Sequence, residues 1–233
     1  MTPVKQVSKQ ISEENLLRDL SYVKNGTRFH DILFSIVEPG YGLTTLEPGC
    51  GSGKLSMWYA LRGASTWLLD IDPGAIDYAA ALWNKVRDWF NTLETGRLSP
   101  PYPPVFQHGS ILKLPYPDEW FDFVFNEGVP HHWGYDPHDT RRQRSINQMA
   151  RVAKRGGWVC VMVSNMHCER TREMAAETEH TYPGMPPKQK PFTQYELCRR
   201  LVIAGLDEQT VNVCPVSGDL DESEIIAGWG RKL

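Results

Sequence analysis

A glycine-rich turn between two short apolar runs constrains the fold of this chain more than any other feature. Residues 47–53 read Glu-Pro-Gly-Cys-Gly-Ser-Gly; they follow an apolar run at 43–46, and Asp70 closes the next apolar run. This order predicts strand, glycine turn, helix, strand and acidic residue, the layout by which α/β sheets hold a nucleoside. Glycines let the main chain approach a ligand closely, and the following helix start offers free N–H groups to an anion. We therefore expect a ligand cradle here.

The spacing of the glycines argues against two common ligands. A dinucleotide-binding turn needs a third glycine or an alanine, where this chain has Lys54 if the count starts at Gly49, or Ser56 if it starts at Gly51. A phosphate-binding loop needs Ser or Thr directly after its lysine, and Leu55 stands there instead. Both a nicotinamide dinucleotide and a nucleoside triphosphate are thus disfavoured.

Five motifs in the same order resemble those of the class I S-adenosylmethionine-dependent methyltransferases, of the type 11 and type 25 kind. They occupy residues 47–53, 68–73, 109–115, 121–124 and 151–157, so the resemblance covers roughly residues 40–213. It implies an α/β fold, a three-layer αβα sandwich around a Rossmann-like, doubly wound, seven-stranded mixed sheet with an antiparallel last strand. It also implies S-adenosylmethionine as the cofactor and S-adenosylhomocysteine as the product.

The resemblance places the cofactor at the carboxyl ends of the first strands. The carboxylate of the cofactor suits the helix start after Gly51, and an acidic rim suits its ammonium and diol. Asp70 is expected to bind the ribose hydroxyls, Ile71 to lie against adenine, and Ser110 to stand where the family often has an acidic residue. A plainer interpretation makes Asp70 and Asp72 two caps in one loop. The expected cofactor residues are Glu47, Gly49, Cys50, Gly51, Gly53, Asp70, Ile71, Ser110, Ile111, Asn126 and Glu127.

The segment after the fourth expected strand is the best place for acceptor chemistry, because ligands of doubly wound sheets bind outside the carboxyl strand ends. It contains His131 and His132, either of which could be the general base if the acceptor is a hydroxyl. The plain alternative is that both histidines bond the main chain at a helix start. A metal site with His138 is disfavoured, because no acidic or cysteine ligand completes a recognised set. Aromatic residues in three separate segments are expected to wall the acceptor pocket: Tyr22, Trp133 and Tyr182.

Length and composition predict one domain in 233 residues. The hydrophobic content of 41% suffices for one ordinary core, and the net charge of −3 carries no strong nucleic-acid signature. We expect an N-terminal helical lid at 1–40, a cofactor-binding core at 41–165, a lid insertion at 166–192, and a C-terminal helix with antiparallel strands at 193–233. Without a secretory or membrane-spanning run, the chain is expected to be cytoplasmic, as a monomer or homodimer.

Hydrophobic periodicity and cap residues predict the individual elements. Ser12, Asp72 and Thr193 are expected to cap helices, and Arg155-Gly156-Gly157 is expected to turn a helix into a strand that begins at Trp158. The expected strands are 43–46, 66–70, 105–107, 121–125, 158–163, 210–213 and 225–229.

These observations predict a methyltransferase that moves a methyl group from S-adenosylmethionine to an O or N of a small-molecule acceptor by in-line displacement. Orientation of the two reactants is expected to contribute more than a general base. Two alternatives remain open. One is a protein that binds S-adenosylmethionine without catalysis, and the other is an oxidoreductase that uses a nicotinamide dinucleotide.

Overall fold

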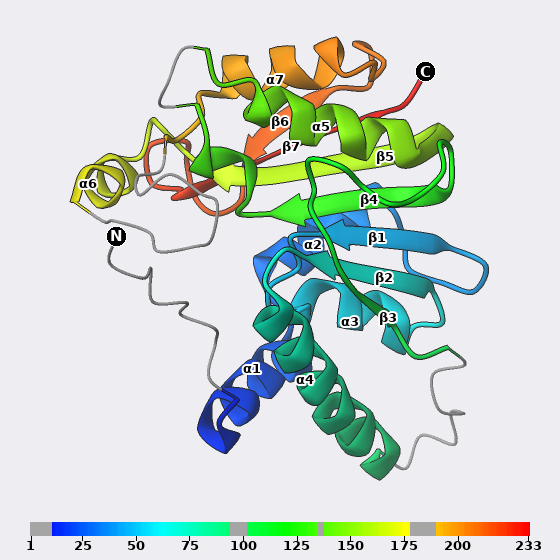
Figure 1. Ribbon diagram of the computed structural model, residues 1–233. Coiled ribbons are helices and arrows are strands. Elements are labelled where there is room, and N and C mark those ends of the chain that lie inside the picture. Colours follow the sequence, from blue (N-terminus) through cyan, green and yellow to red (C-terminus); the bar gives the residue numbers. More distant parts are fainter. Residues whose placement is uncertain (1–10, 94–101, 135–137, 178–189) are drawn as a thin grey trace, which may run out of the picture.

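The structure is a computed structural model that describes residues 11–93, 102–134, 138–177 and 190–233 (Figure 1). Its helices are α1 (Glu13–Asn25), α2 (Arg28–Ile36), α3 (Lys54–Leu61), α4 (Pro73–Thr92), the short 3-10 helix η1 (Pro130–His132), α5 (Arg141–Val152), α6 (Glu169–Glu177) and α7 (Gln194–Ile203). Its strands are β1 (Thr44–Pro48), β2 (Ser65–Asp70), β3 (Val105–His108), β4 (Phe121–Glu127), β5 (Ala153–Ser164), β6 (Asn212–Pro215) and β7 (Ile225–Arg231).

The seven strands form one mixed sheet in the order β3-β2-β1-β4-β5-β7-β6. The pairs from β3 to β5 are parallel, and β7 runs antiparallel to both of its neighbours. This confirms the expected sheet, including the antiparallel last strand. The chain builds outward from β1 to β3 and then returns to add β4 on the other side of β1. A ligand crevice is expected at such a reversal, beyond the carboxyl ends of β1 and β4.

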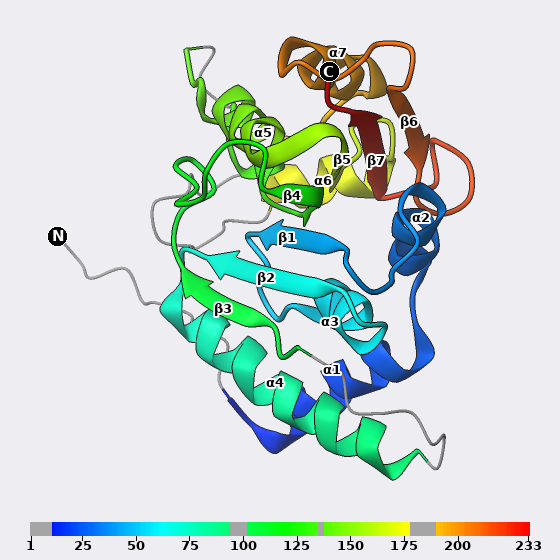
Figure 2. The ribbon, with the colours of Figure 1, turned by 90° about the vertical axis from the view of Figure 1, so that its right-hand side faces the viewer.

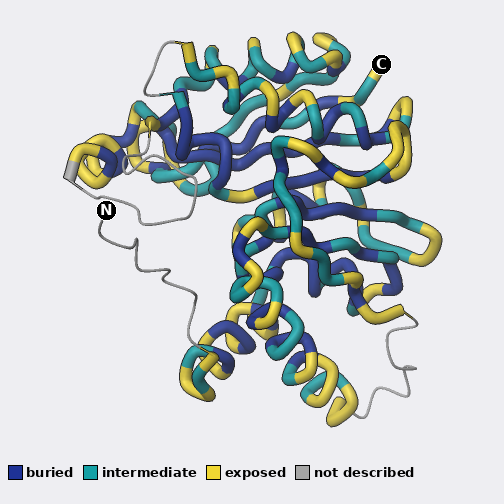
Figure 3. Tube along the Cα trace, viewed as in Figure 1, coloured by how far each residue is buried: buried dark blue, intermediate teal, exposed yellow. Residues whose placement is uncertain are grey.

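Helices cover both faces of the sheet, which explains why β4 is apolar on both sides. Val124 packs with residues of α5 and α7 in one core cluster, whereas Phe123 and Phe125 pack with residues of α2 and α3 in another. Figure 1 shows α5 and α7 at one end of the view and α1 with α4 at the other. Figure 3 shows that burial concentrates on the central strands. The three-layer sandwich is thereby confirmed.

The N-terminal helices begin and pack as their sequence indicates. Ser12 accepts a hydrogen bond from the Asn15 N–H at the start of α1. The apolar stripe of α1, which includes Leu16, Leu20 and Val23, then packs against α3 and α4. Both α1 and α2 contact α3, the helix that follows β1. Residues of both helices also line a cavity with Glu47 and Glu127, so the two helices reach the carboxyl ends of β1 and β4. No helix among the described residues is long and apolar enough to cross a membrane.

The start of β5 differs from the prediction. The expected turn at 155–157 was wrong, since β5 already begins at Ala153 and pairs with β4 through an irregular register. Gly156 has a φ of 72°, and the main chains of Gly156 and Gly157 exchange hydrogen bonds of 2.9 Å with Lys232. A Cβ on Gly157 would lie 2.9 Å from the Asp122 carbonyl oxygen. Gly157 therefore serves close strand approach, whereas Gly156 supplies a positive φ where the register of β5 is irregular.

Candidate functional site at the carboxyl ends of β1 and β4

The glycine turn after β1 combines tight packing with one open position. Gly49, Gly51 and Gly53 have φ values of 77°, 52° and 71°, a left-handed region that other residues seldom adopt. A Cβ on Gly49 would collide with Val129, and one on Gly53 would collide with Leu68. A Cβ on Gly51 would meet nothing within 4 Å. The outer glycines thus let the turn fit the core, and Gly51 leaves open space where a ligand can approach the main chain.

Asp70 connects the end of β2 to this turn. Its Oδ2 accepts a 2.8 Å hydrogen bond from the Gly51 N–H, and its Oδ1 accepts a 2.9 Å bond from the Asp72 N–H. Asp72 in turn caps α4 by accepting from the Gly74 N–H at 2.9 Å, with Pro73 in the first turn, as predicted. Burial raises the pKa of Asp70 above its usual value. A carboxylate can accept further hydrogen bonds on both oxygens, so Asp70 can still bind a diol.

Glu47 closes the buried side of the turn. Its Oε2 accepts hydrogen bonds from the Ser56 N–H at 3.1 Å and from the Ser56 hydroxyl at 2.6 Å, so it takes a donor from the first turn of α3. The side chain is only 3% exposed. Burial raises the pKa of Glu47 to about 8, and the nearby charge of Glu127 adds to the shift. The N–H of Ser56 is therefore already used by the protein itself.

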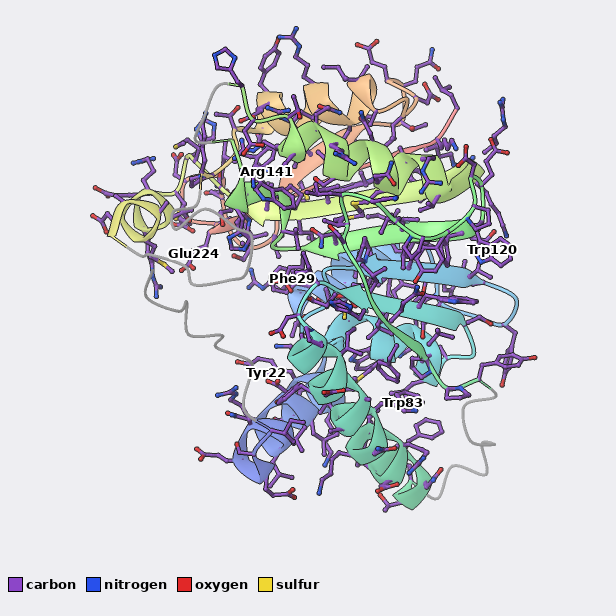
Figure 4. The ribbon with its side chains drawn as sticks, viewed as in Figure 1. Tyr22, Phe29, Trp83, Trp120, Arg141 and Glu224 are labelled. Carbon is purple, nitrogen blue, oxygen red and sulfur yellow. The ribbon has the colours of Figure 1, made fainter. Side chains whose placement is uncertain are left out.

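A cavity of about 260 Å³ lies beside the turn, between the strand ends and the N-terminal helices. Three of the predicted cofactor residues line it, namely Glu47, Cys50 and Glu127, and so does Tyr22 from α1. Figure 4 shows Tyr22 and Phe29 on the side of the sheet where β1 and β4 end. The remaining lining residues are Thr27, Phe29, His30, Ser52, Lys54 and Leu55, none of which the sequence interpretation had assigned to the site. What these residues share in the sequence is that each lies within the expected lid, or within or next to the glycine motif.

His30 contributes a neutral imidazole to this cavity. It is 3% exposed, and its Nδ1 accepts a 2.9 Å hydrogen bond from the Thr27 N–H. Burial lowers the pKa of His30 to about 4, although the Lys54 main chain partly opposes the shift. At neutral pH the single ring proton is thus assigned to Nε2, because Nδ1 is the acceptor. Glu127 also lines the cavity, and its side chain is in contact with solvent. The protein around it nevertheless excludes enough water to raise its pKa.

Asn126 has an internal role at the end of β4. It is fully buried, its Nδ2 donates to the Pro48 carbonyl at 2.5 Å, and its Oδ1 accepts from the Val129 N–H at 3.3 Å. The side chain thereby joins the ends of β1 and β4. Its predicted contact with the cofactor stays a prediction.

The residues predicted to contact adenine lie in the loops after β2 and β3. Ile71 is 41% exposed and is available for a ring to lie against, and its carbonyl oxygen is 2.9 Å from the Nε2 of His108. Ser110 accepts a 3.2 Å bond from the Leu112 N–H through its hydroxyl, and Ile111 is mostly buried in the core. His108 was not assigned from the sequence, since nothing there indicates that its ring reaches the neighbouring loop.

The two predicted catalytic histidines lie in η1 and do not line the cavity, and the predicted acceptor residue Trp133 follows them directly. His131 and His132 are 4% and 7% exposed, and their rings are 4.7 Å apart. The Nδ1 of His131 accepts a 3.1 Å hydrogen bond from the Ser164 N–H. Trp133 is 3% exposed within the core, is not among the cavity-lining residues, and Tyr182 lies outside the described residues. Within the described ranges, no group of three His, Cys, Asp or Glu side chains is arranged to hold a metal ion.

Comparisons with known proteins agree with this geometry. The family model of the methyltransferase domain matches residues 46–161. A search of curated proteins returned no match. Among solved structures, the chain is similar to an S-adenosylmethionine-dependent methyltransferase from Methanosarcina mazei, with 20% identity over 87% of this chain and 97% of that one and a TM-score of 0.60. A second such methyltransferase, from Aquifex aeolicus, has 17% identity over 96% and 100% of the two chains and a TM-score of 0.59.

A third similar structure is the protein solved in complex with the Haloferax volcanii Trm112 methyltransferase activator. Its identity is 16% over 92% of this chain and 93% of that one, with a TM-score of 0.61. At such identities the structural likeness shows the fold, and the family model adds the domain type. The open glycine turn, the acidic end of β2 and the cavity beside them fit a nucleoside with a charged amino-acid end. The chain belongs to the S-adenosylmethionine-dependent methyltransferases, and S-adenosylmethionine is its cofactor.

Proposed function

We propose that the enzyme transfers the methyl group of S-adenosylmethionine to an oxygen or nitrogen of a small-molecule acceptor by in-line displacement. The observation that carries this proposal is the small volume of the cavity beside the glycine turn. At about 260 Å³, lined by α1, α2 and the strand ends, it has room for the amino-acid end of the cofactor and a small group beside it. A macromolecular acceptor would need a broader surface.

The cofactor would be held by groups that the fold already positions. The main chain at Gly51 would lie along its amino-acid end, Asp70 would accept from the ribose hydroxyls, and Ile71 would lie against adenine. When bound, the cofactor supplies a methyl group on a positively charged sulfur. Glu47, Gly49, Cys50, Gly53, Ser110, Ile111, Asn126 and Glu127 complete the proposed cofactor site.

Catalysis then depends mainly on the orientation of the acceptor. Holding two reactants in line can supply effective molarities of roughly 10⁵ to 10⁸ M, whereas a general base adds about 10² to 10⁴-fold. The Ser164 N–H donates to Nδ1 of His131, so the neutral ring carries its proton on Nε2 and suits donation to the acceptor. We assign removal of an acceptor proton to His132. The N-terminal segment 1–40 and the insertion 166–192, together with Tyr22 and Tyr182, would enclose the acceptor.

A screen for S-adenosylhomocysteine release tests this function. Small alcohols, phenols and amines should support release, whereas folded proteins and nucleic acids should not. With an active acceptor, His132→Asn should lower kcat by up to about 10²-fold at unchanged cofactor affinity. Release supported only by a macromolecule would overturn the proposal. Cofactor binding without release for any acceptor would favour the non-catalytic alternative.

A further inference from the structure

Lys54 lies at the cavity beside the glycine turn and contacts α1, an arrangement that the glycine motif alone does not indicate. It is the first residue of α3 and lines the cavity beside the turn. Its ammonium nitrogen lies 4.6 Å from the ring centre of Tyr22 and 3.9 Å from Oδ1 of Asp19, and both of these residues belong to α1. The N-terminal helix thus holds a cation at the wall of the cavity.

This cation has hydrogen-bonding capacity to spare. Asp19 is 1% exposed, its Oδ2 accepts a 2.8 Å hydrogen bond from the Tyr78 hydroxyl, and its Oδ1 lies 3.6 Å from Nε of Arg18, so Lys54 is not the sole partner of this buried carboxylate. The distance of 3.9 Å from Lys54 to Asp19 is too long for a hydrogen bond. Among the described residues, the Lys54 ammonium makes no shorter polar contact. Its three donors remain for a ligand in the cavity.

The charges around the cavity make Lys54 its natural site for an anion. The other charged lining residues are Glu47 and Glu127, and His30 is neutral at physiological pH because of its lowered pKa. Lys54 therefore bears the permanent positive charge among the described residues that line the cavity. Its charge partly opposes the rise in pKa that burial causes at Glu47 and Glu127. The three side chains are therefore close enough to interact electrostatically.

The usual alternative for an anion, the start of α3, is partly taken. Glu47 already accepts from the N–H and the hydroxyl of Ser56 in the first turn of this helix. A second carboxylate in the same place would have to share the Ser56 N–H with Glu47, so this helix start has fewer free donors to offer. Binding of the cofactor carboxylate at this helix start, which the sequence analysis expected, is therefore less favourable in this chain.

We propose that Lys54, held by Asp19 and Tyr22 of α1, binds the carboxylate at the amino-acid end of S-adenosylmethionine, while Glu127 receives the ammonium group. The two side chains line the same cavity, one from the start of α3 and the other from the end of β4, and they match the opposite charges of the amino-acid end. Recognition of that end therefore depends on α1, which lies outside the matched domain at 46–161. This inference concerns the cofactor alone and does not depend on the class of acceptor.

Isothermal titration calorimetry with two ligands tests the assignment. S-adenosylmethionine carries the carboxylate, and decarboxylated S-adenosylmethionine lacks it but keeps the ammonium and the sulfonium. Lys54→Met should weaken binding of the first ligand by about 10- to 100-fold, the usual effect of losing a charged hydrogen bond. It should change binding of the second ligand less than about threefold. Lys54→Arg, which keeps the charge, should restore most of the lost affinity.

Lys85→Met is the matched control. Lys85 also contacts α1, through a 2.7 Å ion pair with Glu13, but does not line the cavity, so both affinities should stay at the wild-type value. Thermal unfolding of each variant without ligand separates lost binding from lost folding. Equal weakening of both ligands by Lys54→Met, or no weakening of either, would overturn the assignment. Neither result would bear on the proposed acceptor, because no acceptor is present in the measurement.

Discussion

The proposed nucleoside side and the proposed amino-acid side of the cofactor site are built in different ways. On the nucleoside side, the loop after β2 supplies the Asp70 carboxylate and the exposed Ile71, and two main-chain N–H groups, one of them from Gly51 in the glycine turn, hold Asp70. On the amino-acid side, the cavity collects side chains from α1, α2, α3 and the end of β4. The first side depends on backbone torsions that glycines impose, and the second depends on how separate helices pack. Substitutions should therefore affect the two sides differently.

Two glycines of the same turn should separate folding from binding. Gly49→Ala should lower the free energy of unfolding by about 3 kcal/mol, because the new methyl collides with Val129 at a positive φ. Gly51→Ala should cost only about 1 kcal/mol for its backbone, yet weaken S-adenosylhomocysteine by about 10- to 100-fold, because its methyl enters the open cradle. Chemical denaturation and calorimetry measure the two effects. A turn in which both variants lose only stability would not be the cofactor cradle.

The buried carboxyl of Glu47 should make stability depend on pH. Its pKa is about 8 in the folded protein against 4.5 in the unfolded chain, so its contribution is complete below pH 4.5 and is lost as the pH rises toward 8. The loss should reach about 1.4 kcal/mol per pH unit at most. His30, whose pKa is lowered to about 4, acts in the opposite direction below pH 6.5.

The window from pH 6.5 to 8 is therefore the cleanest for this measurement. The wild-type protein should lose stability to urea across it, and Glu47→Gln should show a flatter dependence. Asp70 and Glu127, whose pKa values are also raised, act in the same direction as Glu47 but are common to both proteins and cancel in the difference. Parallel pH curves for the two proteins would contradict the raised pKa.

Two aspartates in one loop should distinguish ligand binding from capping. Asp70→Asn should weaken S-adenosylhomocysteine by about tenfold, because an amide cannot accept from both the Gly51 and Asp72 N–H groups and the ribose. Asp72→Asn should leave affinity unchanged, since asparagine caps a helix as well as aspartate does. Calorimetry measures the affinity of both variants, which have each lost one carboxylate charge from the same loop. Equal affinities would support the plainer interpretation of both residues as caps.

The smallest effect is expected at the far end of α1. Ser12→Ala removes the cap of the helix and should lower the free energy of unfolding by about 1 kcal/mol. Affinity for S-adenosylhomocysteine should not change, because the first turn of α1 lies away from Asp19 and Tyr22. A thermal melt and a titration of the same sample check both statements. A loss of affinity as large as that expected for Lys54→Met would show that the whole helix, and not its last turns, shapes the cavity.

The sequence predicted the parts of this molecule that depend on local chemistry. The glycine turn and the caps at Ser12, Asp72 and Thr193 are confirmed, because glycine torsions and cap side chains act over a few residues. The seven-stranded mixed sheet, which the family resemblance implied, is confirmed as well. The start of β5 was wrong, since Gly156 and Gly157 resemble a turn until the neighbouring strands are known. His30, Phe29 and Lys54 were missed for a related reason. Their place in the cavity follows from how α1 and α2 pack beside α3, which no local pattern records.

The amide of Asn126 has a consequence for how groups on neighbouring strands stay aligned. A donor carried by one strand and a reactive centre carried by the next must keep their separation in every turnover, because an error of about 1 Å can cost about a hundredfold in rate. By bridging Pro48 and Val129, this buried side chain makes that separation a property of the sheet. The spacing of the two strand ends is then set by this bridge and does not depend on the conformation of the loops farther along the chain.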